Sequence, residues 1–348
     1  MDGLWLTYAD KPLWEAWLSR FPERDQDIYF TPEYTRLYAT TDEEACCYIY
    51  SDGPHIFFYA FICSLVPYLT NHYDITTPYG YGGPISNTSD QVFLKEALEN
   101  FYKKAEEQKI IAEVIKFHPI LQNASLFSQV YRGKIFDICQ TVYVDIEHDK
   151  ENLWDNIYTH ANRKNINKSL RNNYTVSFSR EHNAWLAFRK LYTETMLANN
   201  ADQSFLYPEN YFLHIQKHLP EQYILATCQQ DGVIVAVLLV LLGKRFAHCH
   251  LLGTDREAMK FGVNNLLHHE LINWCASQGY ELLHLGGGRG NSEDDPLLKF
   301  KKNFTDKQLT FRVGENILDA EHYELACTRW QTENPGRTSH GRLLQYRF

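Results

Sequence analysis

The sequence lacks paired cysteines, a surplus of basic charge and a long apolar run. Its eight cysteines include no CxxC pair. Those with apolar neighbours, such as Cys63 and Cys275, are typical of reduced core residues, so we expect a reducing compartment and no metal site. A net charge of −9 disfavours a broad basic surface for duplex DNA. The longest apolar run, Val233–Leu242, is too short to span a bilayer.

The sequence does contain enough apolar residues for two domains. Its 348 residues, 44% of them apolar, exceed what one ordinary core uses. No basic segment followed by an apolar stretch opens the chain, so we expect no signal peptide and a cytoplasmic location. Residues 145–152 are polar and charged. This predicts an N-terminal domain over residues 1–148 and a C-terminal domain over 149–348, with the tail after about residue 330 packed back on the first domain.

Short strands and helices alternate in both halves. The dipeptides Asp52-Gly53 and Asp231-Gly232 each join two strand-like runs, as hairpin turns do. The predicted strands are residues 45–51, 55–65, 110–117, 223–230, 233–242, 245–252, 280–285 and 309–313. The predicted helices are residues 11–21, 90–108, 150–172, 182–199, 266–277, 296–304 and 319–332. This order predicts an α/β (α+β) protein whose two domains each have a mixed, largely antiparallel sheet flanked by helices.

Histidines on two predicted neighbouring strands are candidates for acid–base chemistry. His248 and His250 alternate with Cys249 and therefore share one face of their strand, and His284 ends the next strand. Imidazole titrates near neutrality, so His250 and His284 are the candidate general acid or base of an acyl transfer. The alternative is that these histidines are hydrogen-bonded core residues.

A glycine run and a lysine between two phenylalanines follow. Gly286 and Gly287 come directly after a strand but match no nucleotide-binding motif, which favours a tight turn whose amides meet a substrate. On a helix, Phe300 and Phe304 share a face and Lys301 projects beside them. Such a lysine can hold a phosphate or stabilise an oxyanion; alternatively, the helix is a solvated basic one.

Four cations lie close together within residues 162–171. They are Arg163, Lys164, Lys168 and Arg171, in a chain that is otherwise acidic. Such a run is either a solvated helix face or a contact for phosphates, including those of a tRNA acceptor end. Arg163 and Lys168 are the candidates for substrate binding.

These segments resemble the Fem-type branch of the GNAT acyltransferase superfamily. Residues 162–176 are similar to the basic segment that opens the Fem catalytic domain, residues 274–288 to its helix–strand–glycine segment, and residues 300–304 to its F-K-x-x-F element. The resemblance covers most of residues 150–330 and implies two tandem GNAT-like domains. It also implies that Lys301 stabilises the reacting acyl ester, and that aminoacyl-tRNA is the donor for a peptidoglycan precursor or related cell-envelope amine.

The first half resembles a companion, degenerate GNAT-like domain that supplies the acceptor side. The resemblance rests on residues 79–84 and 116–119 and makes Tyr79, Tyr81, Lys116 and His118 candidate substrate-binding residues. The family's phosphate-binding lysine is absent from residues 31–38. The implied acceptor is a small-molecule or lipid-linked glycopeptide or saccharide.

The turn at residues 260–265 bears on the donor. CoA-dependent GNAT enzymes hold pyrophosphate on a glycine-rich turn at this position, whereas this chain has Gly262 alone, followed by Asn264 as a candidate substrate contact. We therefore expect no tightly bound cofactor and weak CoA binding. An acyl-CoA-dependent N-acyltransferase is the alternative enzyme. A non-catalytic ligand-binding or partner protein of a cell-envelope gene cluster is the alternative from another class.

Overall fold

The computed structural model describes residues 3–290, 292, 294–337 and 341–347. The chain folds into two compact units, residues 1–138 with 310–348, and residues 139–309. The predicted division placed residues 139–148 in the first domain and residues 310–348 in the second. The units differ from it because β13 (Gln308–Ile317) pairs with β6 (Ile110–Lys116) of the first unit.

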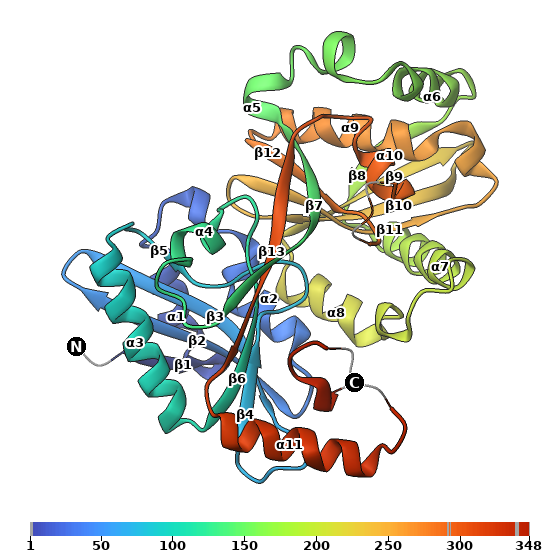
Figure 1. Cartoon of the computed structure of the whole chain (residues 1–348). Coiled ribbons are helices and arrows are strands. Elements are labelled where there is room, and N and C mark those ends of the chain that lie inside the picture. Colours follow the sequence, from blue (N-terminus) through green and yellow to red (C-terminus); the bar gives the residue numbers. More distant parts are fainter. Residues whose placement is uncertain (1–2, 291, 293, 338–340, 348) are drawn as a thin grey trace. The chain divides into compact units, whose positions relative to one another are not determined.

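The first unit has a mixed sheet whose one parallel pair is β4–β6. Five other strands complete it or lie on it, and five helices accompany them. In order, the strands are β1 (Leu4–Thr7), β2 (Glu43–Asp52), β3 (His55–Leu65), β4 (Tyr73–Thr76), β6 and β13, with β5 (Ile85–Ser86) on β3. The helices are α1 (Lys11–Leu18), α2 (Pro32–Tyr38), α3 (Gln91–Glu107), α4 (Asn123–Phe127) and α11 (Ala320–Glu333). In Figure 1, α3 covers one face of this sheet and α11 lies across the lower ends of β4 and β6.

Aromatic side chains form much of the first unit's core. Phe101 of α3 packs against Tyr59 and Phe61 of β3 and Trp5 of β1. Asp52 and His55 pair across the predicted hairpin, where Gly53 has a φ of +56° that disfavours other residues.

The C-terminal tail belongs to the first unit. Trp330 of α11 and Tyr346 pack with Ile111 of β6. The guanidinium of Arg347 donates to the buried Asp74 carboxylate at 2.8 Å. The tail is therefore part of this unit's core.

The second unit has a sheet of six strands. In order they are β7 (Lys134–Asp145), β12 (Leu282–Gly287), β11 (Phe246–Thr254), β10 (Val233–Leu242), β9 (Tyr223–Gln230) and β8 (Thr175–Ser179). Neighbours are antiparallel except β11 and β12. The helices are α5 (Ile146–Asp149), α6 (His160–Arg171), α7 (His182–Ala198), α8 (Glu209–His218), α9 (Val263–Ser277) and α10 (Pro296–Lys301).

The sheet of the second unit is covered on both faces. On one face, Ile166 of α6 and Leu271 of α9 share a core with Leu283 and Leu285 of β12. On the other face, α7 packs against β10 and β11. None of the helices that the structure describes is long and apolar enough to cross a membrane.

The predicted fold class is confirmed, but local predictions need correction. The elements that were not expected are β1, β4, β5, β7, β8, α2, α4, α5 and α8. The helix predicted over residues 150–172 is interrupted: Tyr158 is extended, and Thr159 begins α6 by accepting a hydrogen bond from the Asn162 amide at 3.2 Å. A threonine at this position satisfies a free amide of a new helix, which explains the break.

Candidate active site

β11 and β12 are parallel neighbours that separate after a short ladder. Phe246–His248 pair with Leu282–His284, and the ladder ends there. β11 continues alongside β10 to Thr254, while β12 passes through a bulge at its border with β7 into the glycine run. Gly286 has a φ of +78°, a conformation that glycine adopts at little cost. The opening between the strands therefore begins at a defined place.

Lys301 lies beside the glycine run. Its Nζ donates to the Gly287 carbonyl at 2.7 Å, and its side chain is half-buried. Burial lowers the pKa of Lys301 to about 8, against the opposing influence of Cys249, Asp295 and Cys139. An ammonium with this pKa is charged at neutral pH and loses its proton more readily than an exposed lysine.

Asp295 connects the glycine run to the helix that carries Lys301. Its carboxylate accepts from the amides of Leu297 and Leu298, which begins α10, and from those of Arg289 and Gly290, which end the turn. Burial alone would raise the pKa of Asp295, but these backbone hydrogen bonds lower it below its usual value. The sequence analysis did not identify Asp295; its position before Pro296 was the available signal.

The aromatic residues beside Lys301 pack on α9. The Phe300 ring lies 5.2 Å from the His268 ring and 5.5 Å from Phe304. His268 donates to the Asn264 carbonyl, and burial lowers the pKa of His268 to about 4. Phe300 therefore fixes α10 against α9, and Lys301 is left at the edge.

The candidate histidines lie on the other face of the sheet. His248 and His250 alternate with Cys249, which packs into the core beneath α9. Burial raises the pKa of the Cys249 thiol to about 12, and the charge of Lys301 opposes this. The His284 ring lies 5.7 Å from that of His248. The structure therefore does not bring Lys301 into one cluster with His250 and His284.

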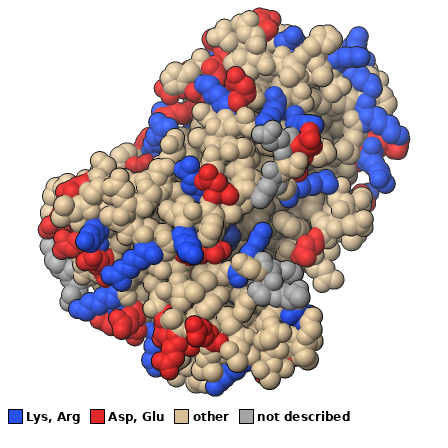
Figure 2. Space-filling view, viewed as in Figure 1, with Lys and Arg blue, Asp and Glu red and all other residues tan. Residues whose placement is uncertain are grey.

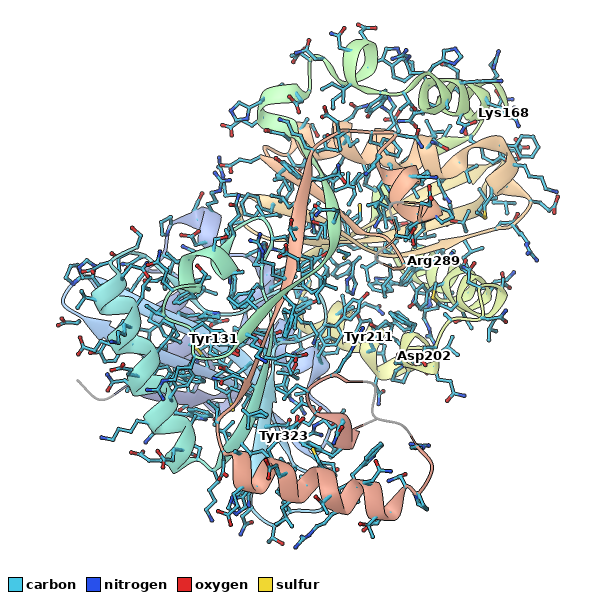
Figure 3. All side chains as sticks on the ribbon, in the orientation of Figure 1. Tyr131, Lys168, Asp202, Tyr211, Arg289 and Tyr323 are labelled. Carbon is cyan, nitrogen blue, oxygen red and sulfur yellow. The ribbon has the colours of Figure 1, made fainter. Side chains whose placement is uncertain are left out.

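His250 forms a hydrogen bond with a tyrosine that the sequence analysis did not identify. The Tyr211 hydroxyl of α8, labelled in Figure 3, lies 2.7 Å from Nε2 of His250. Burial, with the charge of His248, lowers the pKa of His250 to about 3. The sequence analysis could not pair Tyr211 with His250, because it did not predict α8.

Helix α6 covers the turn at residues 260–265. Lys168 (Figure 3) donates to the Lys260 carbonyl at 2.6 Å, and Ser169 to the Phe261 carbonyl at 2.7 Å. A Cβ on Gly262 would lie 2.7 Å from the Asn165 carbonyl. Asn264, in the first turn of α9, accepts from the Thr254 hydroxyl at 2.9 Å. The turn is therefore in close contact with the chain's own helix.

The cations of α6 fall into two groups. Arg163 donates to the carbonyls of Trp154 and Tyr158, both at 2.8 Å, and Lys168 to that of Lys260. Lys164 and Arg171 are exposed and form no ion pair with any residue that the structure describes, and Arg171 donates only to the Asn167 carbonyl of its own helix, at 3.2 Å. Lys164 and Arg171 are therefore more available for an anionic ligand.

The candidates of the first unit lie around the loop at residues 77–84. Lys116 donates to the Thr77 carbonyl at 3.0 Å, and burial lowers its pKa to about 8. The His118 ring lies 6.1 Å from Tyr81 and 2.8 Å from the buried Asp27 carboxylate. Tyr79 is 39% exposed, and its carbonyl accepts from the Tyr34 hydroxyl. The structure therefore brings His118 and Tyr81 together, while Lys116 and Tyr79 contact other residues.

The second unit matches a known protein family. Residues 161–302 match the acetyltransferase (GNAT) domain model. No curated protein sequence matches the chain.

Similar solved structures span nearly the whole chain. FemX is 14% identical with a TM-score of 0.71, covering 93% of this chain and 99% of its own. L-PGS from Bacillus licheniformis is 14% identical with a TM-score of 0.58, covering 92% and 96%. The C-terminal domain of a proposed lysylphosphatidylglycerol synthetase from Agrobacterium fabrum is 13% identical with a TM-score of 0.56, covering 92% and 94%. At these identities the similarity establishes the fold.

Proposed function

Because residues 161–302 form a GNAT acyltransferase domain within a FemX-like fold, we propose that the chain transfers an aminoacyl group from a charged tRNA to an amine. The observation that carries this proposal is the half-buried Lys301 ammonium on the Gly287 carbonyl, beside the opening between β11 and β12. A structural neighbour named as a lysylphosphatidylglycerol synthetase makes a product that contains an amino acid, which supports an aminoacyl donor.

In the proposed reaction, the acceptor amine attacks the carbonyl carbon of the aminoacyl ester. A C–N bond forms, the ester C–O bond breaks, and the ribose hydroxyl of the RNA leaves with the proton that the amine gives up. Negative charge develops on the carbonyl oxygen, where a preorganised ammonium stabilises the transition state more than the ground state. Lys301 is suited to this role because Asp295 and Phe300 fix its helix.

We assign the two histidines different roles. His250 is neutral above about pH 3 and bonded to Tyr211, and so weak a base accepts a proton poorly at neutral pH. We therefore propose that His250 positions Tyr211. His284 is buried at the last rung of the β11–β12 ladder, on the sheet face away from Lys301, so we propose that it supports the strand pair and that the leaving ribose oxygen takes the amine proton.

The exposed face of α6 is the proposed contact for the donor RNA. Lys164 and Arg171 line a groove of about 860 Å³ together with Trp154, whose ring offers a stacking surface for a base. Figure 2 shows Lys and Arg side chains gathered over this helix at the upper right. Changing Lys164 and Arg171 to Glu should weaken tRNA binding and reduce its salt dependence by ~0.9 in log–log slope per lost phosphate contact. Lys103→Glu on α3 is the control.

The cluster around residues 77–84 is the proposed acceptor site. Lys116 supplies a cation for an anionic group, and Tyr79 and Tyr81 supply aromatic surface. A peptidoglycan precursor or a related lipid-linked envelope molecule carries both an amine and phosphates or carboxylates, which suits this set. Incubation with such acceptors and charged tRNA, followed by mass spectrometry of the acceptor, identifies the product.

The donor is tested by binding to the purified full chain. We expect radiolabelled aminoacyl-tRNA to be retained on a filter, and calorimetry to detect no acetyl-CoA binding, because α6 covers the turn at Gly262. Micromolar binding of acetyl-CoA without tRNA would instead favour the acyl-CoA-dependent enzyme, which the GNAT match also supports. Retention of neither donor would favour a non-catalytic ligand-binding protein.

A further inference from the structure

Two cysteines of the first unit contact each other across neighbouring strands. Cys46 of β2 pairs with Phe61 of β3, and Cys63 lies two residues beyond Phe61, so both thiols are on one face of the sheet. The Cys46 thiol forms a hydrogen bond with the Cys63 thiol, and Cys63 packs against the aromatic core that contains Cys46. Neither cysteine is in a disulfide. The two sulfur atoms are therefore already in contact as thiols.

A pocket in the first unit makes this thiol pair accessible. Both cysteines line a cavity of about 550 Å³, together with Trp5 and Tyr73. Cys46 is 1% exposed, whereas Cys63 is half-buried. A small molecule that enters the pocket therefore meets the Cys63 thiol first, and the Cys46 thiol is the more protected of the two.

We infer that Cys46 and Cys63 form a redox-active pair that a low-molecular-weight disulfide, such as oxidised glutathione, converts into an intramolecular disulfide. The Cys63 thiolate attacks one sulfur of the reagent, so a mixed disulfide forms, the S–S bond of the reagent breaks and one reagent thiol leaves. Cys46 then attacks the Cys63 sulfur and releases the second reagent thiol. The two cysteines are oxidised by two electrons, which reduce the reagent, and their two protons end on the reagent thiols. This inference is independent of the proposed acyl transfer.

The surroundings of the two thiols set the order of attack. The hydrogen bond with Cys63 and burial both raise the pKa of the Cys46 thiol, and a protonated thiol is a poor nucleophile. Once the Cys63 sulfur is bonded to the reagent, the Cys63 thiol no longer hydrogen-bonds with Cys46, and the sulfur that Cys46 must attack is beside it. Cys63 is therefore the attacking cysteine and Cys46 the resolving one.

The position of the pair on the two strands favours a reversible bond. Diagonal neighbours across an antiparallel pair lie farther apart than residues directly opposite, so a disulfide between Cys46 and Cys63 draws β2 and β3 together at some cost in strain. Strained disulfides are reduced more easily than relaxed ones and are the regulatory kind. We therefore expect the bond to form in an oxidising glutathione buffer and to open again in a reducing one.

The test treats the folded, reduced full chain with oxidised glutathione, alkylates the remaining thiols and maps the peptides by mass spectrometry. We expect one linked peptide that contains Cys46 and Cys63, with the other six of the eight cysteines alkylated, and loss of the link after reduced glutathione is added. Absence of this peptide, its appearance only in urea, or linkage of Cys63 to a different cysteine would overturn the inference.

Single substitutions separate the roles of the two cysteines. Cys46→Ala should stop the reaction at the mixed disulfide, so Cys63 retains one glutathione, whereas Cys63→Ser should give neither product. Cys47→Ala is the matched control, because Cys47 is the next residue of β2 and is buried on the opposite face in a different cluster; it should leave the Cys46–Cys63 bond unchanged. Glutathione retained on Cys46 in Cys63→Ser would contradict the assigned order. Circular dichroism of each variant confirms that it is folded.

Discussion

The parallel strand pair of the first unit stays joined beyond its ladder, whereas that of the second unit separates. After Thr76 of β4 pairs with Val114 of β6, the Thr77 amide donates to the Val114 carbonyl and Gly82 bridges to Phe117. β11 and β12 have no such continuation after His248 and His284 among the described residues. We therefore expect the proposed acyl donor to enter between β11 and β12 of the second unit.

The two units also differ in what surrounds their lysines. Lys116 and Lys301 each donate to a carbonyl of a glycine-containing segment, and burial lowers each pKa to about 8. Lys116 is the last residue of β6, which stays paired with the segment after β4. Lys301 lies on α10, beside the separated strands β11 and β12. We therefore propose that these similar ammonium groups serve different substrates, with Lys116 binding the acceptor and Lys301 binding the acyl ester.

The largest expected effect separates the two lysines. Lys301→Met should lower kcat by ~10²–10³, the usual loss of an oxyanion donor, because charge on the ester oxygen loses its partner. Lys116→Met should raise KM for the acceptor and change kcat much less. Steady-state kinetics of both variants, with Lys302→Met as the control on the same segment, measure the difference. Equal kcat losses in both variants would end the division of roles.

The stability of the first unit should depend on the Thr77 hydroxyl, which lies where the β4–β6 pair continues. Thr77 is fully buried, and its Oγ1 accepts from the Lys116 amide at 2.8 Å. Thr77→Val leaves that amide without an acceptor, which should reduce the free energy of unfolding by ~1–3 kcal/mol. Urea denaturation measures it. Thr332→Val, on the exposed side of α11, should change stability by less than about 0.5 kcal/mol; a similar loss there would contradict the explanation.

The charge of Lys301 predicts a pH dependence. Because burial lowers its pKa from 10.5 to about 8, kcat should fall as pH rises through about 8, by up to ~tenfold per pH unit. The free energy of unfolding should instead rise with pH. The unfolded chain binds the Lys301 proton more tightly than the folded chain, so the contribution of Lys301 to folding becomes more favourable from about pH 8 to 10.5. If Lys116→Met removed this pH dependence of kcat and Lys301→Met did not, the group that titrates in catalysis would be Lys116 and not Lys301.

The elements of the second unit could be predicted because their signals are local. The apolar runs, the glycines after β12 and the spacing of Phe300 and Phe304 each lie within a few residues, so periodicity and turn chemistry indicated the strands and the turn. The role expected for Lys301 came from the resemblance to the Fem-type family. The extent of β13 was not predictable in the same way. Its pairing with β6 depends on a partner nearly two hundred residues away, so the sequence analysis left the tail's place as an expectation.

Contacts between distant segments were not predictable from spacing. Asp295 is recognisable as a helix N-cap, but its bonds to Arg289 and Gly290 depend on how the turn folds back. Arg163 and Lys168 were candidates for binding a substrate anion, yet each donates to backbone carbonyls. Sequence shows where cations occur but not which carbonyls of the folded chain require donors.

The smallest expected effect concerns Asp295, which gives the open pair of the second unit its fixed lysine. Asp295→Ala removes the cap of α10 and the acceptor for the Arg289 and Gly290 amides. Loss of a cap costs about 1 kcal/mol of stability, and a less fixed Lys301 should lower kcat while leaving donor binding nearly unchanged. Asp295→Asn restores an oxygen for the cap and should recover most of the stability. Thermal melts and kinetics of the two variants check this: kcat unchanged in Asp295→Ala would show that Lys301 is positioned by Phe300 and α9 alone.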